Sequence, residues 1–229
     1  MKIKERIEKY SSSTNLNIIP KVPVAFSLNI NNFSRLNLDK PFDTKFSDAV
    51  LCTMIKLCNE IEGCVFAYNF LDEIILISRN DQSNDTLPWY DNNVQKLASI
   101  TASIASVEFN KVYGDDIYFN SHVFSLPNMV ECSNFISSKQ HQYTQKLLNN
   151  LVHDHLQISL EESLTLTIED KVQLLEEKDV HYNSFNSILR KGCAVYRKKD
   201  RDKLRWYLDR DVPVFLHSKD FLYSIFLSS

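Results

Sequence analysis

The sequence predicts an α+β protein built on an antiparallel sheet with two helices on one face. Short runs rich in β-branched and aromatic residues alternate with longer stretches of helical periodicity, in the order strand, helix, strand, strand, helix, strand up to residue 126. Two of the strands follow each other almost directly, and so short a connection allows only an antiparallel hairpin. With 44% apolar residues in 229, the chain has ample material for a core.

The elements are predicted in chain order by local signals. The first strand follows Pro23, and the first helix carries apolar residues at helical spacing and stops at Gly63. The second helix is rich in Ala and Ser, which allow close packing on a sheet, and Pro127 ends the last strand. The predicted strands are 22–30, 64–70, 73–78 and 121–126, and the predicted helices are 42–63 and 92–110. This order is the ferredoxin-like βαββαβ pattern.

The remainder of the chain reads as a C-terminal helical and basic extension. Helices are expected at 137–156 and 168–178, followed by a basic segment and a terminal strand over 212–216. We therefore divide the chain into a sheet region, 1–129, and a helical and basic region, 130–229, packed on it as one compact unit.

Several classes of protein are disfavoured. No run of about 18 uncharged apolar residues occurs and the N-terminal segment is charged and then polar, so we expect a cytoplasmic protein with no membrane partner. The five cysteines are scattered without a CxxC pair, which is typical of reduced, buried thiols. Only three glycines occur, so neither a glycine-rich phosphate loop nor a dinucleotide fingerprint is present.

An acidic pair, Asp72 and Glu73, lies at the predicted hairpin between strands 64–70 and 73–78. Adjacent carboxylates at the middle of such a sheet are typical of two-metal nucleotidyl transfer, where divalent cations offset their repulsion and desolvation. The alternative is a hairpin tip in water with both side chains solvated.

A basic segment between Leu189 and Arg210 holds nine Lys or Arg against three Asp, with Tyr196, Trp206 and Tyr207 interleaved. Cations neutralise phosphates and flat rings stack on bases, so this composition favours RNA binding. A solvated surface hairpin is the alternative. The candidate RNA-binding residues are Arg190, Lys191, Arg197, Lys198, Lys199 and Arg201.

An ordered set of motifs from about Pro23 to Phe215 resembles the tRNA(His) guanylyltransferase family, the 3′ to 5′ polymerases. The motifs are PVAFSLNINNF, KPFD, GCVFAYNFLDEIIL, VQKLASITASIASVEFN, FNSHVFSLP and RWYLDRDVPVF. The resemblance implies a palm-like sheet, two Mg²⁺ ions, nucleoside triphosphates such as GTP or ATP as donors, and the 5′ end of tRNA or a tRNA-like RNA as acceptor. It also implies an oligomer, usually a homotetramer; a hetero-oligomer with a paralogue is the alternative for a degenerate relative.

Site residues carried over from the resemblance fall into two groups. Asp72 and Glu73 match the family's catalytic acidic pair and, with Asn29, are the implied metal ligands. The implied nucleotide-binding residues are Lys40, Lys96, Ser99, Asn31 and His122.

The departures from the family pattern are concentrated in its first-strand motif, Arg-x-Asp-Gly-Arg-x-Phe. Where the family has its metal-binding Asp, this chain has Asn29. Ile30 replaces the Gly and Asn31 replaces the second Arg of the motif. His122 replaces another Arg of the family. An amide brings no charge to a metal, and the loss of several charged contacts weakens triphosphate binding.

Three hypotheses follow. The first is a Mg²⁺-dependent nucleotidyltransferase whose activity is weakened or lost. The second is a degenerate relative, a pseudoenzyme that binds RNA or serves as a subunit beside an active paralogue. The third is a module that binds a triphosphate without turning it over. The sequence does not decide whether the chain is an enzyme.

Overall fold

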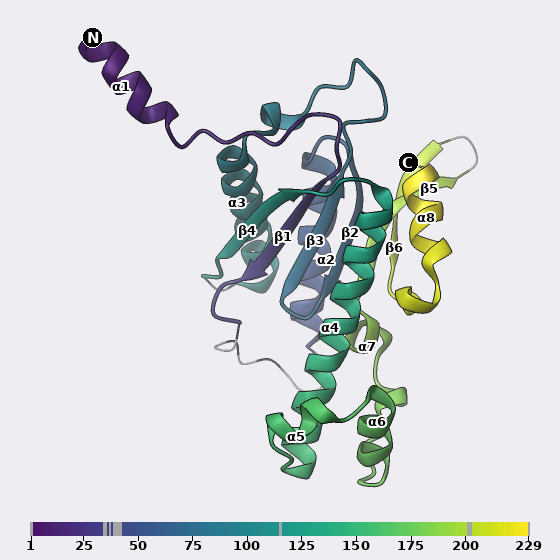
Figure 1. Cartoon of the computed structure of the whole chain (residues 1–229). Coiled ribbons are helices and arrows are strands. Elements are labelled where there is room, and N and C mark those ends of the chain that lie inside the picture. The colour runs from purple at the N-terminus through teal and green to yellow at the C-terminus, as the bar shows by residue number, and fades with distance from the viewer. Residues whose placement is uncertain are drawn as a thin grey trace.

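The computed structural model describes residues 2–33, 36, 38, 43–114, 116–200 and 203–228, without the side chains of 199, 200, 227 and 228. A single antiparallel sheet of six strands in the order β4-β1-β3-β2-β5-β6 forms its centre (Figure 1). The strands are β1 Val24–Ile30, β2 Cys64–Phe70, β3 Glu73–Ser78, β4 Phe119–Ser125, β5 Cys193–Asp200 and β6 Lys203–Asp209. The first four have the strand order of the predicted ferredoxin-like palm, which is confirmed.

Helices α2 (Thr44–Glu60) and α3 (Val94–Tyr113) cover one face of the sheet. Each begins where a side chain caps it: Asp43 accepts from the amide of Phe46 at 2.7 Å, and Asn93 accepts from that of Lys96 at 3.0 Å. Alternate strand residues, among them Phe26 and Leu28, pack on these helices in the first core layer.

The opposite face of the sheet is covered by α4 (Met129–Leu156) and α8 (Lys219–Ser228), with α4 lying in front of the strands in Figure 1. The alternate residues, including Phe66, Tyr68 and Ile75, form the second core layer. The remaining helices are α1 Ile3–Ser12, α5 Leu160–Thr165, α6 Ile168–Glu176 and α7 Ser187–Lys191, with the short 3₁₀ turns η2 Trp89–Asn92, η3 Tyr182–Ser184 and η4 Phe215–His217.

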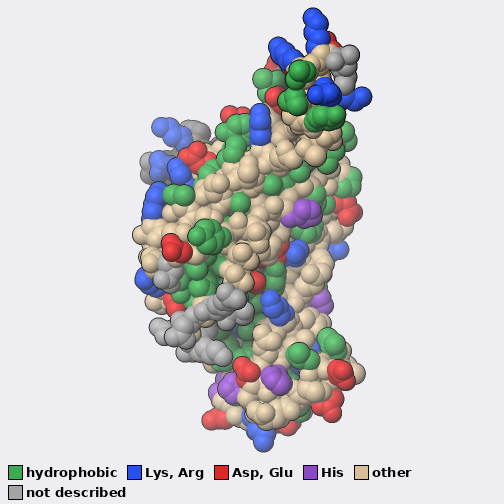
Figure 2. Space-filling view, turned by 90° about the vertical axis from the view of Figure 1, so that its left-hand side faces the viewer, with side chains coloured by type: hydrophobic (Ala, Val, Ile, Leu, Met, Phe, Trp, Pro, Cys, Tyr) green, Lys and Arg blue, Asp and Glu red, His purple; other side chains and the backbone are tan. Residues whose placement is uncertain are grey.

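Helix α1 stands away from the body and buries none of its residues. Figure 2 shows basic and hydrophobic side chains exposed on it, and acidic and histidine side chains at the opposite end of the molecule, where Figure 1 places α5 and α6. No helix in the described ranges is both long and apolar enough to cross a membrane.

Two predictions at the C-terminal side need correction. The helix predicted over 137–156 begins earlier, at Met129, because Asn128 caps it by accepting from the amide of Glu131 at 3.0 Å. The strand predicted over 212–216 is wrong. Val212 and Phe215 are fully buried by packing rather than by strand pairing, and the amide of Phe215 donates to Gln140 Oε1 of α4 at 2.8 Å.

Gly192 precedes β5 with φ +77° and ψ −168°, a conformation open essentially to glycine alone. A Cβ there would lie 2.2 Å from the carbonyl oxygen of Asn69, in the neighbouring strand β2. The position therefore requires glycine, because only the absence of a Cβ allows the start of β5 to lie this close to the backbone of β2.

We expect Gly192→Ala to lower the free energy of unfolding by about 3 kcal/mol or more, because backbone strain and a backbone clash add. Gly114→Ala is the matched control: its φ is +87°, but the nearest atom to a new Cβ is the flexible end of Lys45 at 3.9 Å, so a loss of about 1 kcal/mol is expected. Urea denaturation of both variants checks the difference, and equal losses would contradict it.

Candidate functional site

The β2–β3 hairpin places the acidic pair at one end of the sheet. Leu71 turns the chain with a φ of +55°, and the side-chain amide of Asn69 donates to the carbonyls of Leu71 (3.2 Å) and Glu73 (2.8 Å). The amide of Ile30, at the end of β1, donates to the carbonyl of Asp72 at 3.1 Å. The hairpin is thus held against the first strand by backbone contacts.

The strand register brings several predicted residues to one face. Asn29 lies directly opposite Glu73, and His122 lies opposite Ser27. Opposed residues of antiparallel strands share a face, and Ser27 and Asn29 share one because they are two residues apart. This face is the one covered by α4, and His122 is exposed on it with its ring 5.2 Å from that of Phe124.

Glu73 is 1% exposed, yet its carboxylate has donors on both oxygens. The ammonium of Lys139 lies 2.9 Å from Oε2 and 3.0 Å from Oε1. The hydroxyl of Tyr143 donates to Oε2, and that of Ser27 donates to Oε1. A buried charge is tolerated only when it is paired with an opposite charge and hydrogen-bonded. Glu73 has the ammonium of Lys139 as its counter-charge and two hydroxyl groups as further donors.

The pKa of Tyr143 is raised well above its ordinary value, first by burial and then by its hydrogen bond to Glu73. Its phenol therefore keeps its proton and remains a donor to the carboxylate throughout the neutral range.

Lys139, Tyr143 and Lys146 come from one side of α4, since they are spaced i, i+4 and i+7. Lys146 has its ammonium 3.6 Å from Oδ1 of Asp72, with its own side chain 54% exposed. Asp72 Oδ1 is buried and makes no hydrogen bond within the described structure. Because water screens so exposed a partner, this ion pair is the weaker of the two.

The side chains do not fit the two Mg²⁺ ions that the resemblance implies. Glu73 is engaged by Lys139, Tyr143 and Ser27, and the amide nitrogen of Asn29 donates to Ser27 Oγ at 3.3 Å. Ile30 stands where the family has glycine. Within the described ranges, no group of three or more His, Cys, Asp and Glu side chains is arranged to hold a metal.

The predicted nucleotide-binding residues are not brought together. Lys96 and Ser99 are exposed near the start of α3, which packs on the other face of the sheet from Glu73. Asn31 is exposed just after β1, and its amide donates to the carbonyl of Tyr118 at 2.8 Å. Lys40 lies outside the described residues.

The basic segment forms the β5–β6 hairpin. Strand β5 pairs with β2 only over residues 193–196, so the outer half of the hairpin extends beyond β2. There Arg197 lies over the ring of Trp206 at 4.9 Å and Lys198 over that of Tyr207 at 5.0 Å. Both cations are exposed on described backbone, whereas the side chain of Lys199 and all of Arg201 lie outside the described residues.

Arg190 and Lys191 lie apart from this hairpin, in α7. They line a cavity of about 550 Å³ between α4, α6 and η4. The Arg190 side chain donates to the carbonyl of Phe185 at 3.0 Å, and Lys191 pairs with Asp211 at 2.7 Å. The predicted RNA-binding set is therefore divided between two places, and these two members are engaged within the chain.

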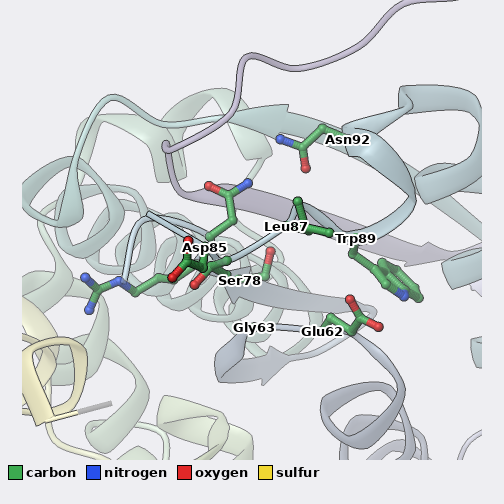
Figure 3. Close-up of a pocket in the computed structure, with 10 residues that line it drawn as sticks. Glu62, Gly63, Ser78, Asp85, Leu87, Trp89 and Asn92 are labelled. Atoms are coloured by element: carbon green, nitrogen blue, oxygen red, sulfur yellow. The ribbon is translucent and has the colours of Figure 1, made fainter. Parts of the chain in front are cut away.

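A second cavity, of about 340 Å³, lies near Ser78, at the opposite end of β3 from Glu73 (Figure 3). In that view Trp89 and Glu62 lie beside each other on one side of it, and Asn92 lies above. It is remote along β3 from the acidic pair and takes no part in that site.

The sequence analysis did not identify four residues that contact the acidic pair: Ser27, Lys139, Tyr143 and Lys146. The i, i+4, i+7 spacing of the last three on a helix was the available signal, because it places two cations and a phenol on one side. No local sequence signal indicates that this side of α4 contacts the β2–β3 hairpin.

Comparisons with known proteins support the fold. The family model described as tRNAHis guanylyltransferase matches residues 4–131. A bacterial tRNA(His) guanylyltransferase-like protein in complex with ATP superposes with a TM-score of 0.85 at 23% identity, covering 98% of each chain. In complex with GTP, a protein of the same description gives 0.81 at 22% identity, covering 97% of this chain and 98% of the other. The tRNA(His) guanylyltransferase from Saccharomyces cerevisiae gives 0.66 at 16% identity, covering 87% of this chain and 94% of the other. No curated protein sequence matches the chain.

We expect Tyr143→Phe to destabilise the protein by about 1–3 kcal/mol, because it removes a donor from a buried carboxylate while keeping the ring packed on Phe70. Tyr118→Phe, on a residue 65% exposed, is the control and should change stability by less than about 0.5 kcal/mol. Chemical denaturation measures both, and a silent Tyr143→Phe would mean that the phenol does not stabilise Glu73.

Proposed function

The chain belongs to the tRNAHis guanylyltransferase family, and from that premise we propose that it is an RNA-binding member that does not itself transfer nucleotides. Its RNA would be a tRNA or a tRNA-like end, as the family name suggests. In this proposal the palm sheet is a scaffold, and the protein acts in an oligomer, either of identical chains or beside an active paralogue.

The observation that carries the proposal is the state of Glu73. Two-metal transfer needs carboxylates whose oxygens are free to ligate the ions. Here Glu73 is bonded to Lys139, Tyr143 and Ser27, and the residue facing it across the sheet is the neutral Asn29. This donor set supports a structural role for Glu73.

The β5–β6 hairpin supports the RNA-binding part. It extends Arg197 and Lys198, each on an aromatic ring, beyond the edge of β2. Cations neutralise phosphates and release counterions, and the exposed face of Tyr207 offers a stacking surface. The overall charge of −3 argues against non-specific attraction, so the local cations have to supply the affinity.

Nucleotidyl transfer is the competing function, and the retained Asp72–Glu73 pair favours it. Incubation with Mg²⁺, labelled nucleoside triphosphates and 5′-truncated or 5′-triphosphorylated tRNA distinguishes the two. We expect RNA binding without transfer of label. Transfer by the wild type that disappears in Asp72→Ala would overturn the proposal.

We expect Arg197→Ala with Lys198→Ala to weaken RNA binding about tenfold or more and to reduce the slope of log K against log salt by about 1 to 2. Lys111→Ala with Lys178→Ala removes the same charge from exposed lysines elsewhere and is the control. Fluorescence anisotropy with labelled tRNA at several salt concentrations measures both. If the two double variants weakened RNA binding equally, RNA would bind on another surface.

A further inference from the structure

We propose that the ammonium group of Lys139 is a built-in counter-ion that takes the place of a divalent cation at Glu73, so that this carboxylate is satisfied without metal. This inference deepens the proposed function at the same site and rests on it.

The position of the ammonium is that of a chelated cation. Its nitrogen is nearly equidistant from the two oxygens of Glu73, at 2.9 and 3.0 Å, rather than bonded to one of them. Lys139 reaches this point from α4, and its ammonium also lies 5.8 Å from the rings of Phe135 and Tyr143. The aromatic rings favour a cation there.

The hydrogen bonds leave Glu73 no capacity for a further ligand. An ionised carboxylate offers roughly four lone-pair sites. Oε1 accepts from Lys139 and Ser27, and Oε2 accepts from Lys139 and Tyr143. All these sites are thus used by groups of the chain itself, and a metal ion would have to displace one of them.

The local charges are also balanced. Asp72 and Glu73 bring two negative charges, and Lys146 and Lys139 bring two positive ones. Asn29, opposite Glu73, adds none. A divalent cation entering this cluster would meet the ammonium of Lys139 beside a carboxylate that is 1% exposed, where repulsion is poorly screened, while the more exposed Lys146 adds less.

Metal independence of the fold follows from this arrangement. We expect the thermal midpoint of the wild type to be the same in EDTA and in Mg²⁺. Lys139→Met should lower Tm by about 10 °C, since it leaves a buried carboxylate without its counter-ion. Mg²⁺ should then restore part of that loss, because the vacated position again suits a cation.

Two further variants separate charge pairing from packing. Lys139→Met combined with Glu73→Gln should be more stable than Lys139→Met alone and should not respond to Mg²⁺. Lys146→Met is the matched control on the same side of α4; because its partner contact is longer and its side chain more exposed, its Tm should change by no more than about 2 °C.

Differential scanning calorimetry of these proteins and of Glu73→Gln alone, with and without Mg²⁺, tests the inference. A wild-type Tm that rises with Mg²⁺ would overturn the inference. So would additive effects of Lys139→Met and Glu73→Gln, or a Lys139→Met protein that Mg²⁺ does not stabilise. If Lys139→Met does not fold, Mn²⁺ titration followed by electron paramagnetic resonance serves instead: Mn²⁺ binding by the wild type that is lost in Glu73→Gln overturns the inference, and no such binding supports it.

The outcomes are distinguishable from failure of the proposed function. Label transfer to RNA or absence of RNA binding would overturn the proposed function. Metal binding at Glu73 without transfer would overturn only the counter-ion inference.

Discussion

A carboxylate inside the protein, that of Glu73 in β3, is held by groups from two other elements, and the position of the long helix α4 on the sheet depends on these contacts. Ser27 reaches it from β1, while Lys139 and Tyr143 reach it from α4. A carboxylate that is 1% exposed would be very costly without such partners. Once they are present, the directed bonds specify where α4 lies on the sheet, which apolar packing alone specifies less sharply.

The fold and the site are supported by different forces. Two apolar layers, one on each face of the sheet, stabilise the palm through α2 and α3 on one side and α4 and α8 on the other. The acidic site lies at one end of the second layer and is held by hydrogen bonds and ion pairs. Its chemistry can therefore change while the scaffold stays, which is why high TM-scores to nucleotide-bound relatives coexist with Asn29 and Ile30 in the first strand.

The basic hairpin lies apart from the acidic site on the same sheet. It is anchored where Gly192 lets β5 approach β2, and its outer half extends away from the core with Arg197 and Lys198 on aromatic rings. RNA bound there would use the sheet as support without needing the acidic pair.

Local pattern by itself determined the palm strands, their hairpin, and helices α2 and α3, because period, caps and turns act over a few residues. The departures at Asn29 and Ile30 came from the resemblance to the family's first-strand motif. Only the tertiary structure decided that Lys139 meets Glu73, 66 residues away, and that Lys96 and Ser99 lie on the other side of the sheet. It also decided that the apolar run 212–216 packs on α4 instead of forming a strand. Periodicity tells which side of a helix is apolar or charged, but the face of the sheet that it covers, and the residue that it meets there, are set by long-range packing.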